Sequence, residues 1–204
     1  FSGPDYMILH HKVRHFHKLN RYFRTQVRNI MISLGGGVKY REMRRVVDVL
    51  KRHGYSCKIA SGFTIKKNQK KTLSRLYPGI SWVGQTESLA RAYYQSDVAL
   101  IAPGVSAYEA AATGTPALYL SHHEEQEKTA FLFEREGAGL RLGLLSCVDM
   151  AGIPENLKKL SRERRTAMGI SGKSLVDGLG LYRVNKILNA AVIYGKDNHP
   201  GGTG

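Results

Sequence analysis

The sequence has few of the residues that mark secreted, metal-binding or membrane proteins. Its 204 residues include two cysteines, Cys57 and Cys147, which lie far apart and lack the spacing of metal ligands. No apolar run approaches the ~20 residues of a membrane-spanning helix, and the opening FSGPDYMILHH does not resemble a signal peptide. These absences favour a reducing compartment, so we expect a cytoplasmic protein without a bound metal or cofactor. Because the chain does not begin with methionine, we also expect it to be a piece of a longer protein.

Acidic residues are scarce as well, with 16 Asp and Glu against 31 Lys and Arg, and the net charge is +15. Such a charge suits nucleic acid, an anionic membrane surface or a phosphorylated ligand. The basic residues are spread over 10–28, 39–52, 66–75 and 158–173. They are not interleaved with aromatic side chains, as they are in proteins that stack nucleic-acid bases. We therefore favour a solvated basic surface over a nucleic-acid site.

Short apolar runs alternate with amphipathic helical patterns along most of the chain. This alternation predicts an α/β, Rossmann-like fold, in which a mostly parallel sheet carries helices on both faces. We expect a lead-in or interdomain helix in residues 1–28, the Rossmann-like domain with its C-terminal helices in 29–194, and a disordered tail in 195–204. Thr86 is expected to cap a helix. The expected strands are 30–34, 57–60, 80–83, 98–102, 117–120 and 140–142.

The stretch from 97 to 126 carries a clear functional signal. An apolar run over 98–102 has the length of a strand buried on both faces, and it stops at Pro103-Gly104. A helical pattern follows at Ser106. Small residues at such a turn let an anionic ligand reach the free amides at the helix N-terminus, where the helix dipole also favours negative charge.

Glu109 lies about one helical turn inside that predicted helix. There its carboxylate can accept hydrogen bonds from a hydroxyl or a diol of the same ligand. The alternative is an ordinary crossover helix with a solvated glutamate, and the unit taken alone does not decide between the two.

A run of three glycines, Gly35, Gly36 and Gly37, follows the first predicted strand directly. Glycines at a strand-to-helix turn permit positive φ and close approach of the backbone to a phosphate. The pattern is not G-x-G-x-x-G, because Tyr40 stands where the last glycine should be, and it is not a P-loop. In parallel sheets, ligands bind at the carboxyl ends of strands. The glycine run and the turn at Gly104 both follow strands, so we expect them to form one site.

Several sequence features, taken in order, resemble a known family. They are the entry Gly3-Pro4-Asp5-Tyr6, the strand with Gly35-Gly36, the G-x-S-x-x-E arrangement of Gly104, Ser106 and Glu109 followed by Gly114, Pro116 and Gln126, and the ending VDGLG at 176–180. The set covers roughly residues 2–190 and resembles the C-terminal half of GT-B glycosyltransferases of the MurG type. It is more similar still to the PseG-like UDP-sugar hydrolases of pseudaminic acid biosynthesis and to related spore-coat polysaccharide proteins.

This resemblance implies a UDP-sugar ligand and assigns roles by position. The diphosphate would face the glycine run and the amides at the start of the helix that follows Pro103-Gly104, Glu109 would accept from the ribose hydroxyls, and the strand that ends at Trp82-Val83 would border the uracil. The implied nucleotide-binding residues are Gly35, Gly36, Gly37, Trp82, Val83, Gly104, Val105, Ser106 and Glu109. The implied sugar-binding residues are Glu125 and Gln126.

The sequence also departs from the family pattern. Glu125 replaces the asparagine that usually precedes Gln126, and Pro103 replaces a glycine, which leaves the sugar open. The family's catalytic histidine lies in a first domain that this chain does not contain. We therefore assign no catalytic residue, expect that N-terminal domain as a partner, and expect the chain alone to be inactive.

Three functions follow in order of preference. The first is the UDP-binding half of a hydrolase that releases UDP from a UDP-linked amino-sugar in surface polysaccharide or nonulosonic acid biosynthesis. The second is half of a GT-B glycosyltransferase that uses a UDP-sugar donor. The third belongs to another class, a basic module that binds nucleic acid or an anionic membrane surface and is indifferent to uridine.

Overall fold

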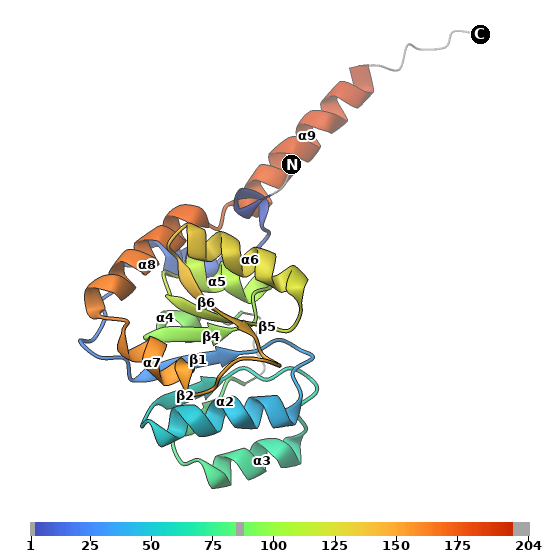
Figure 1. Cartoon of the computed structure of the whole chain (residues 1–204). Coiled ribbons are helices and arrows are strands. Elements are labelled where there is room, and N and C mark those ends of the chain that lie inside the picture. The colour runs from blue at the N-terminus through green and yellow to red at the C-terminus, as the bar shows by residue number, and fades with distance from the viewer. Residues whose placement is uncertain (1–2, 85–87, 198–204) are drawn as a thin grey trace.

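A parallel sheet of six strands forms the centre of the protein in the computed structural model, which describes residues 3–84 and 88–197 (Figure 1). The strands lie in the order β3-β2-β1-β4-β5-β6, and each neighbouring pair is parallel. Their bounds are β1 Asn29–Ser33, β2 Ser56–Ile59, β3 Ile80–Trp82, β4 Val98–Ile101, β5 Ala117–Ser121 and β6 Gly139–Leu144. This arrangement confirms the predicted α/β, Rossmann-like fold.

Helices connect the strands and cover both faces of the sheet (Figure 1). A short 3-10 helix, η1 Pro4–Tyr6, and nine α-helices lie within the described residues. The α-helices are α1 His11–Lys18, α2 Tyr40–Arg52, α3 Lys67–Leu76, α4 Ala90–Tyr94, α5 Val105–Ala112, α6 Glu124–Arg135, α7 Gly152–Lys158, α8 Arg162–Leu175 and α9 Gly180–Asp197.

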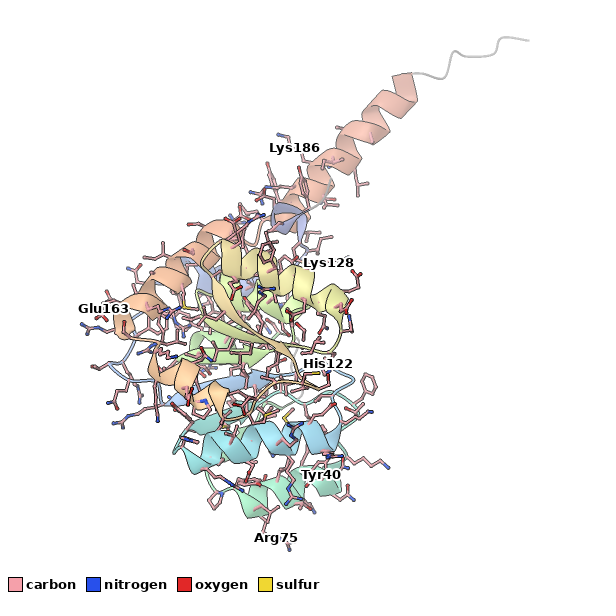
Figure 2. All side chains as sticks on the ribbon, in the orientation of Figure 1. Tyr40, Arg75, His122, Lys128, Glu163 and Lys186 are labelled. Carbon is pink, nitrogen blue, oxygen red and sulfur yellow. The ribbon has the colours of Figure 1, made fainter. Side chains whose placement is uncertain are left out.

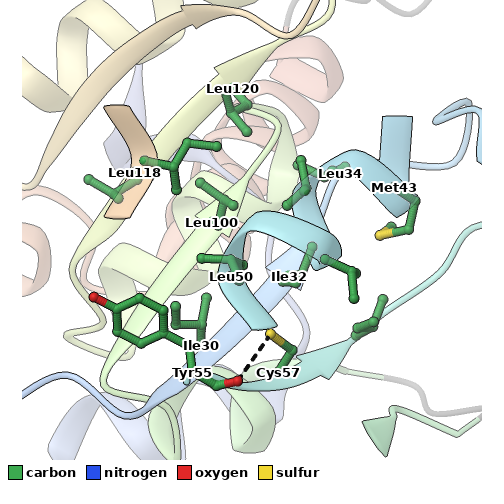
Figure 3. Close-up of a cluster of buried hydrophobic side chains, with 14 of the residues drawn as sticks. Ile30, Ile32, Leu34, Met43, Leu50, Tyr55, Cys57, Leu100, Leu118 and Leu120 are labelled. Atoms are coloured by element: carbon green, nitrogen blue, oxygen red, sulfur yellow. Dashed lines mark hydrogen bonds between the residues drawn. The ribbon is translucent and has the colours of Figure 1, made fainter. Parts of the chain in front are cut away.

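Alternate side chains of the strands enter two separate cores. Ile30, Ile32 and Leu100 point to one face, where they pack with the apolar sides of α2, α3 and α7 (Figure 3). Met31 and Ala99 point to the other face, where α1, α4, α5 and α6 supply the core. Because both faces are buried, the strands read as unbroken apolar runs instead of alternating ones.

Close backbone contacts fix α5, the helix that carries much of the predicted site. Helix α8 packs on it through glycines: a Cβ added at Gly172 would lie 3.1 Å from Ala111 Cα, and one at Gly169 would lie 2.7 Å from Gly114 O. Gly114 itself ends α5 with a φ of 67°, a conformation that glycine adopts without steric cost. Small residues therefore hold the helix rigidly against the sheet and α8.

The two ends of the chain differ from the sequence expectation. Within residues 3–28, α1 is the one α-helix, and 19–28 runs without helix along the amino ends of the strands, because side chains such as Arg21 donate to backbone carbonyls there. Helix α9 projects from the body (Figure 1) and continues to Asp197, since Gly195 alone does not end it. Thr86 and the tail from 198 onward lie outside the described residues. Among the described helices none combines the length and apolarity needed to cross a membrane.

Candidate nucleotide site

The carboxyl ends of β1, β2, β3 and β4 meet at a pocket of about 390 Å³. The side chain of Ser33 ends β1, and the loops that follow the four strands supply the other walls. The lining residues are Ser33, Gly35, Gly36, Ala60, Ser61, Gly62, Val83, Gly84, Leu89 and Ser106. The structure thus brings the glycine run and the turn before α5 together at one sheet edge, as the sequence predicts for a ligand site.

Two glycine loops form the floor of this pocket in direct contact. Gly35 has a φ of 78°, which explains the glycine at that position. A Cβ added at Gly62 would lie 2.3 Å from Gly36 Cα, so neither loop leaves room for a side chain there. The Thr64 hydroxyl donates to the carbonyl oxygens of Gly36 and Val38, at 3.0 and 2.6 Å, and ties the loops together. The result is a rigid floor made of backbone.

Polar groups gather where α5 begins. The hydroxyls of Ser33 and Ser106 lie 3.3 Å apart, across the gap between the end of β1 and the first turn of α5. The buried Tyr93 hydroxyl is beside both serines, and burial raises its pKa. Gly104 and Val105 are exposed at the start of the helix. The Gly104 amide donates to Ala102 O at 2.9 Å, whereas the amides of Val105 and Ser106 have no backbone partner within the described residues and are free for an anion.

Glu109 follows Ser106 by three residues and so shares its side of α5. Its side chain is half-buried, and no hydrogen bond or ion pair to its carboxyl group is found within the described residues. Burial raises the pKa of Glu109 to about 7. Glu109 does not itself line the pocket, and none of the lining residues is acidic or basic. A carboxyl group placed in this way is ready to accept hydrogen bonds from a ligand.

The predicted uracil strand contributes one of its two named residues. Val83 lines the pocket. Trp82 faces the opposite side, where its Nε1 donates to Ser74 Oγ at 2.9 Å and Lys70 Nζ lies 5.4 Å from the ring centroid. Neighbouring residues of a strand point to opposite faces, so the side chains of both could not border one ligand.

The predicted sugar residues also separate. Glu125 is exposed and forms an ion pair with Lys128 at 2.9 Å, so its side chain is outside the pocket. Gln126 Oε1 accepts from the His122 amide at 2.8 Å and lies at the start of α6. The other amide atom of Gln126 is available to a ligand. Gly37 adjoins the pocket without lining it.

Three groups at this edge were not predicted from the sequence. Ser61 and Gly62 follow β2, and their S-G pair after a strand was the available signal. His122 directly follows β5, and its Nε2 donates to Leu34 O at 2.6 Å, which joins the ends of two strands (Figure 2). His122 could have been found from the sequence as a polar residue directly after a predicted parallel strand.

Comparison with known proteins supports this picture of the fold. No family model matches the chain. A curated relative, the spore coat polysaccharide biosynthesis protein SpsG of Bacillus subtilis (strain 168), is 30% identical over 196 residues, which are 92% of this chain and 57% of the relative. The chain therefore spans little more than half the length of the relative.

Solved structures share the same architecture at lower identity. MurG of Acinetobacter baumannii is 18% identical, with a TM-score of 0.65 over 87% of this chain and 52% of that one. A UDP-GlcNAc 2-epimerase of Neisseria meningitidis, bound to UDP-GlcNAc, is also 18% identical, with a TM-score of 0.56 over 82% of this chain and 45% of that one. The chain thus has a GT-B glycosyltransferase-like fold and corresponds in length to about half of such proteins.

Proposed function

We propose that this chain is the nucleotide-binding half of a GT-B glycosyltransferase and that it holds a UDP-sugar donor in the pocket at the carboxyl edge of the sheet. One observation carries the proposal: free amides at the start of α5 and a glycine floor meet at a pocket without charged lining residues, and the unpaired Glu109 carboxyl group lies about one turn further along the same helix. A diphosphate requires amide donors and close approach of the backbone, and a ribose requires a hydrogen-bond acceptor beside them.

The diphosphate is assigned to the backbone. Because no cationic side chain lines the pocket, the diphosphate's charge would be met by the dipole of α5, by the amides of Val105 and Ser106 beside Gly104, and by the loop at Gly35–Gly37. Val83 and Leu89 supply the apolar wall for the uracil. Gln126 is the group we assign to the sugar, through the amide nitrogen that the His122 contact leaves available.

The ribose is assigned to Glu109. An ionised carboxylate accepts two hydrogen bonds from vicinal hydroxyls and repels a phosphate, so it suits the part of the nucleotide between base and diphosphate. Hydroxyl donors favour the charged form, so ligand binding should lower the raised pKa of Glu109.

The similar proteins support glycosyl transfer as the reaction. The GT-B glycosyltransferase-like fold supports a transferase better than the hydrolase that the sequence favoured, because nothing found for this chain is specific to hydrolysis. The relative's name connects that protein with spore-coat polysaccharide biosynthesis, and we propose a polysaccharide-forming role here too. A UDP-sugar also agrees with the UDP-GlcNAc to which the Neisseria epimerase is bound.

The assignment of the ribose to Glu109 is tested by comparing two nucleotides with two forms of the protein. UDP and its 2′-deoxy analogue are titrated calorimetrically into wild type and Glu109→Ala. Loss of a hydrogen bond to a charged group costs ~1.5–3 kcal/mol, so the substitution should weaken UDP roughly 10- to 100-fold and the deoxy analogue much less. Equal losses of affinity for the two ligands would mean that Glu109 does not contact the 2′-hydroxyl.

An activity measurement tests whether this chain binds the nucleotide without catalysing the reaction. A glycosyl transfer needs a positioned acid or base, and we place that group in the part of the longer protein that this chain lacks. The purified chain should bind UDP yet release no sugar from UDP-sugars. Steady release of sugar above a protein-free control would contradict the proposal.

A further inference from the structure

A second cavity, larger than the first, lies at the opposite edge of the sheet. Its volume is about 580 Å³. The walls come from the segment before β1, the turn between α2 and β2, and the junction of α7 with α8 (Figure 1). The lining residues are Thr25, Gln26, Val27, Arg28, His53, Gly54, Tyr55, Ser56, Leu157, Lys158, Leu160 and Ser161. Figure 2 labels Glu163 in the first turn of α8 beside this edge and His122 at the other one.

Positive charge converges on this cavity without a carboxylate in its walls. Arg28 and Lys158 line it, and Arg24 lines an adjoining hollow that shares Thr25, Gln26 and Arg28 with it. Within the described residues these three side chains make no hydrogen bond or ion pair. The nearby Asp97 is buried and does not line the cavity; it accepts from the amides of Arg28 and Asn29 and faces Arg165 at 3.9 Å.

The backbone adds to the positive potential. The long helix α8 begins at the cavity, and its N-cap, Ser161, is one of the lining residues. The positive end of the helix dipole therefore points at the same space as the two cations.

We propose that this amino-edge cavity is a second anion site, distinct from the nucleotide pocket, which takes a phosphate-bearing ligand with at least two negative charges. Unpaired cations with planar or three-donor heads suit phosphate oxygens. The volume is that of a site for a phosphorylated small molecule and exceeds the need of a single inorganic ion. Thr25 and Ser56 offer hydroxyls to the remainder of such a ligand.

Amide-resolved NMR titration with inorganic pyrophosphate tests the proposal. We expect the amides of 25–28, 53–56 and 158–164 to shift together and to saturate, also when UDP is already present in excess. Because the readout is by residue, it is independent of the nucleotide site: shifts confined to 35–37 and 104–106 would overturn this inference and leave the proposed function intact.

A charge-matched pair of variants provides the control. The double substitution Arg28→Gln/Lys158→Gln should weaken pyrophosphate at least tenfold at the amino edge, since each removes a charge-assisted contact. Lys67→Gln/Arg75→Gln removes the same charge from exposed positions on α3 and should change that affinity less than twofold. If both pairs weakened pyrophosphate binding equally, the binding would reflect the net positive charge of the protein and no specific site, which would contradict the proposal. All four side chains are exposed, so both variants should keep the wild-type melting temperature.

A lipid headgroup could supply the same phosphate chemistry as a free metabolite. Vesicles with 30% anionic phospholipid form the second arm of the experiment. Binding to vesicles that falls in the Arg28→Gln/Lys158→Gln variant and is displaced by pyrophosphate supports a headgroup as the source. Pyrophosphate binding without vesicle binding supports a free ligand, and failure of both probes at the amino edge would overturn the site.

Discussion

The two edges of the sheet differ in what their polar groups contact. At the amino edge, the fully buried Arg165 donates to three backbone carbonyls and faces Asp97 across 3.9 Å. Arg21 donates to the Thr115 hydroxyl at 2.9 Å and to Ser96 O. At the carboxyl edge, helix amides and the Glu109 carboxyl group have no protein partner of this kind. At the amino edge the chain thus satisfies its buried cations, whereas at the carboxyl edge the groups that we assign to the nucleotide lack a protein partner.

This contrast separates stability from binding. Buried cations that are hydrogen-bonded on several sides fix the segment before β1 and the start of α8 to the sheet. Their loss should affect folding and leave the nucleotide pocket unchanged. Changes at the carboxyl edge should act chiefly on nucleotide binding, because its open groups are the ones that we assign to the ligand.

The largest expected effect is on stability, from Arg165→Met. The variant leaves the carbonyl oxygens of Leu160, Arg24 and Thr25 without this donor and leaves Asp97 without its cation. Removing one partner of a buried pair costs about 3–5 kcal/mol. Urea denaturation should show this loss, and UDP affinity should stay within about twofold. Arg164→Met, at the exposed neighbouring position, is the control and should change stability by less than about 0.5 kcal/mol.

Gly62→Ala should give the largest effect on binding. The added Cβ would lie 2.3 Å from Gly36 Cα and 2.7 Å from Gly36 O, so the two glycine loops must move apart. We expect UDP affinity to fall at least tenfold in calorimetry, with a stability loss of roughly 1–3 kcal/mol from the strained contact. Gly152→Ala is the control, since nothing lies within 4 Å of its added Cβ. Unchanged affinity in Gly62→Ala would mean that the loop floor does not contact the nucleotide.

Glu109→Gln should change how stability depends on pH. The folded-state pKa is raised from 4.5 to about 7, so the folded protein holds this proton more tightly than the unfolded chain. Its contribution is fully present below pH 4.5 and is lost as pH rises through 7, by roughly 2 kcal/mol. The variant should lack this decline in urea denaturation at pH 5 and 8, whereas Glu155→Gln, at an exposed position on α7, should retain it. A decline of wild-type size in Glu109→Gln would assign the titration to another group.

The sequence predicted the architecture well because both sheet faces are buried. Continuous apolar runs and glycines after strands were enough to predict β1 and β4, and with them the meeting of Gly35 and Ser106. The loop after β2 gave a weaker signal, because Ser61 and Gly62 contribute backbone and a small hydroxyl and no distinctive side chain. Whether Trp82 or Val83 faces the pocket depends on strand register, which this three-residue strand does not reveal.

Side-chain partners were harder to predict than positions. Glu125 was assigned to the sugar from its place beside Gln126. In the structure it pairs with Lys128, three residues along the same helix, a spacing at which opposite charges meet. Arg165 reads as one more charge in a basic helix, yet it is buried, because two of the three carbonyls that it meets belong to Arg24 and Thr25, 141 and 140 positions away. Such long-range contacts leave no local pattern.

A titration of the isotope-labelled chain with UDP, followed residue by residue through its amides, tests the central claim most directly. The account predicts that the amides of 33–37, 60–62, 83–84 and 104–109 shift together with one dissociation constant. It also predicts that these amides saturate at lower UDP concentrations than any at the amino edge. A carboxyl edge that stays unshifted at saturating UDP, while the amino edge responds or nothing does, would contradict the account.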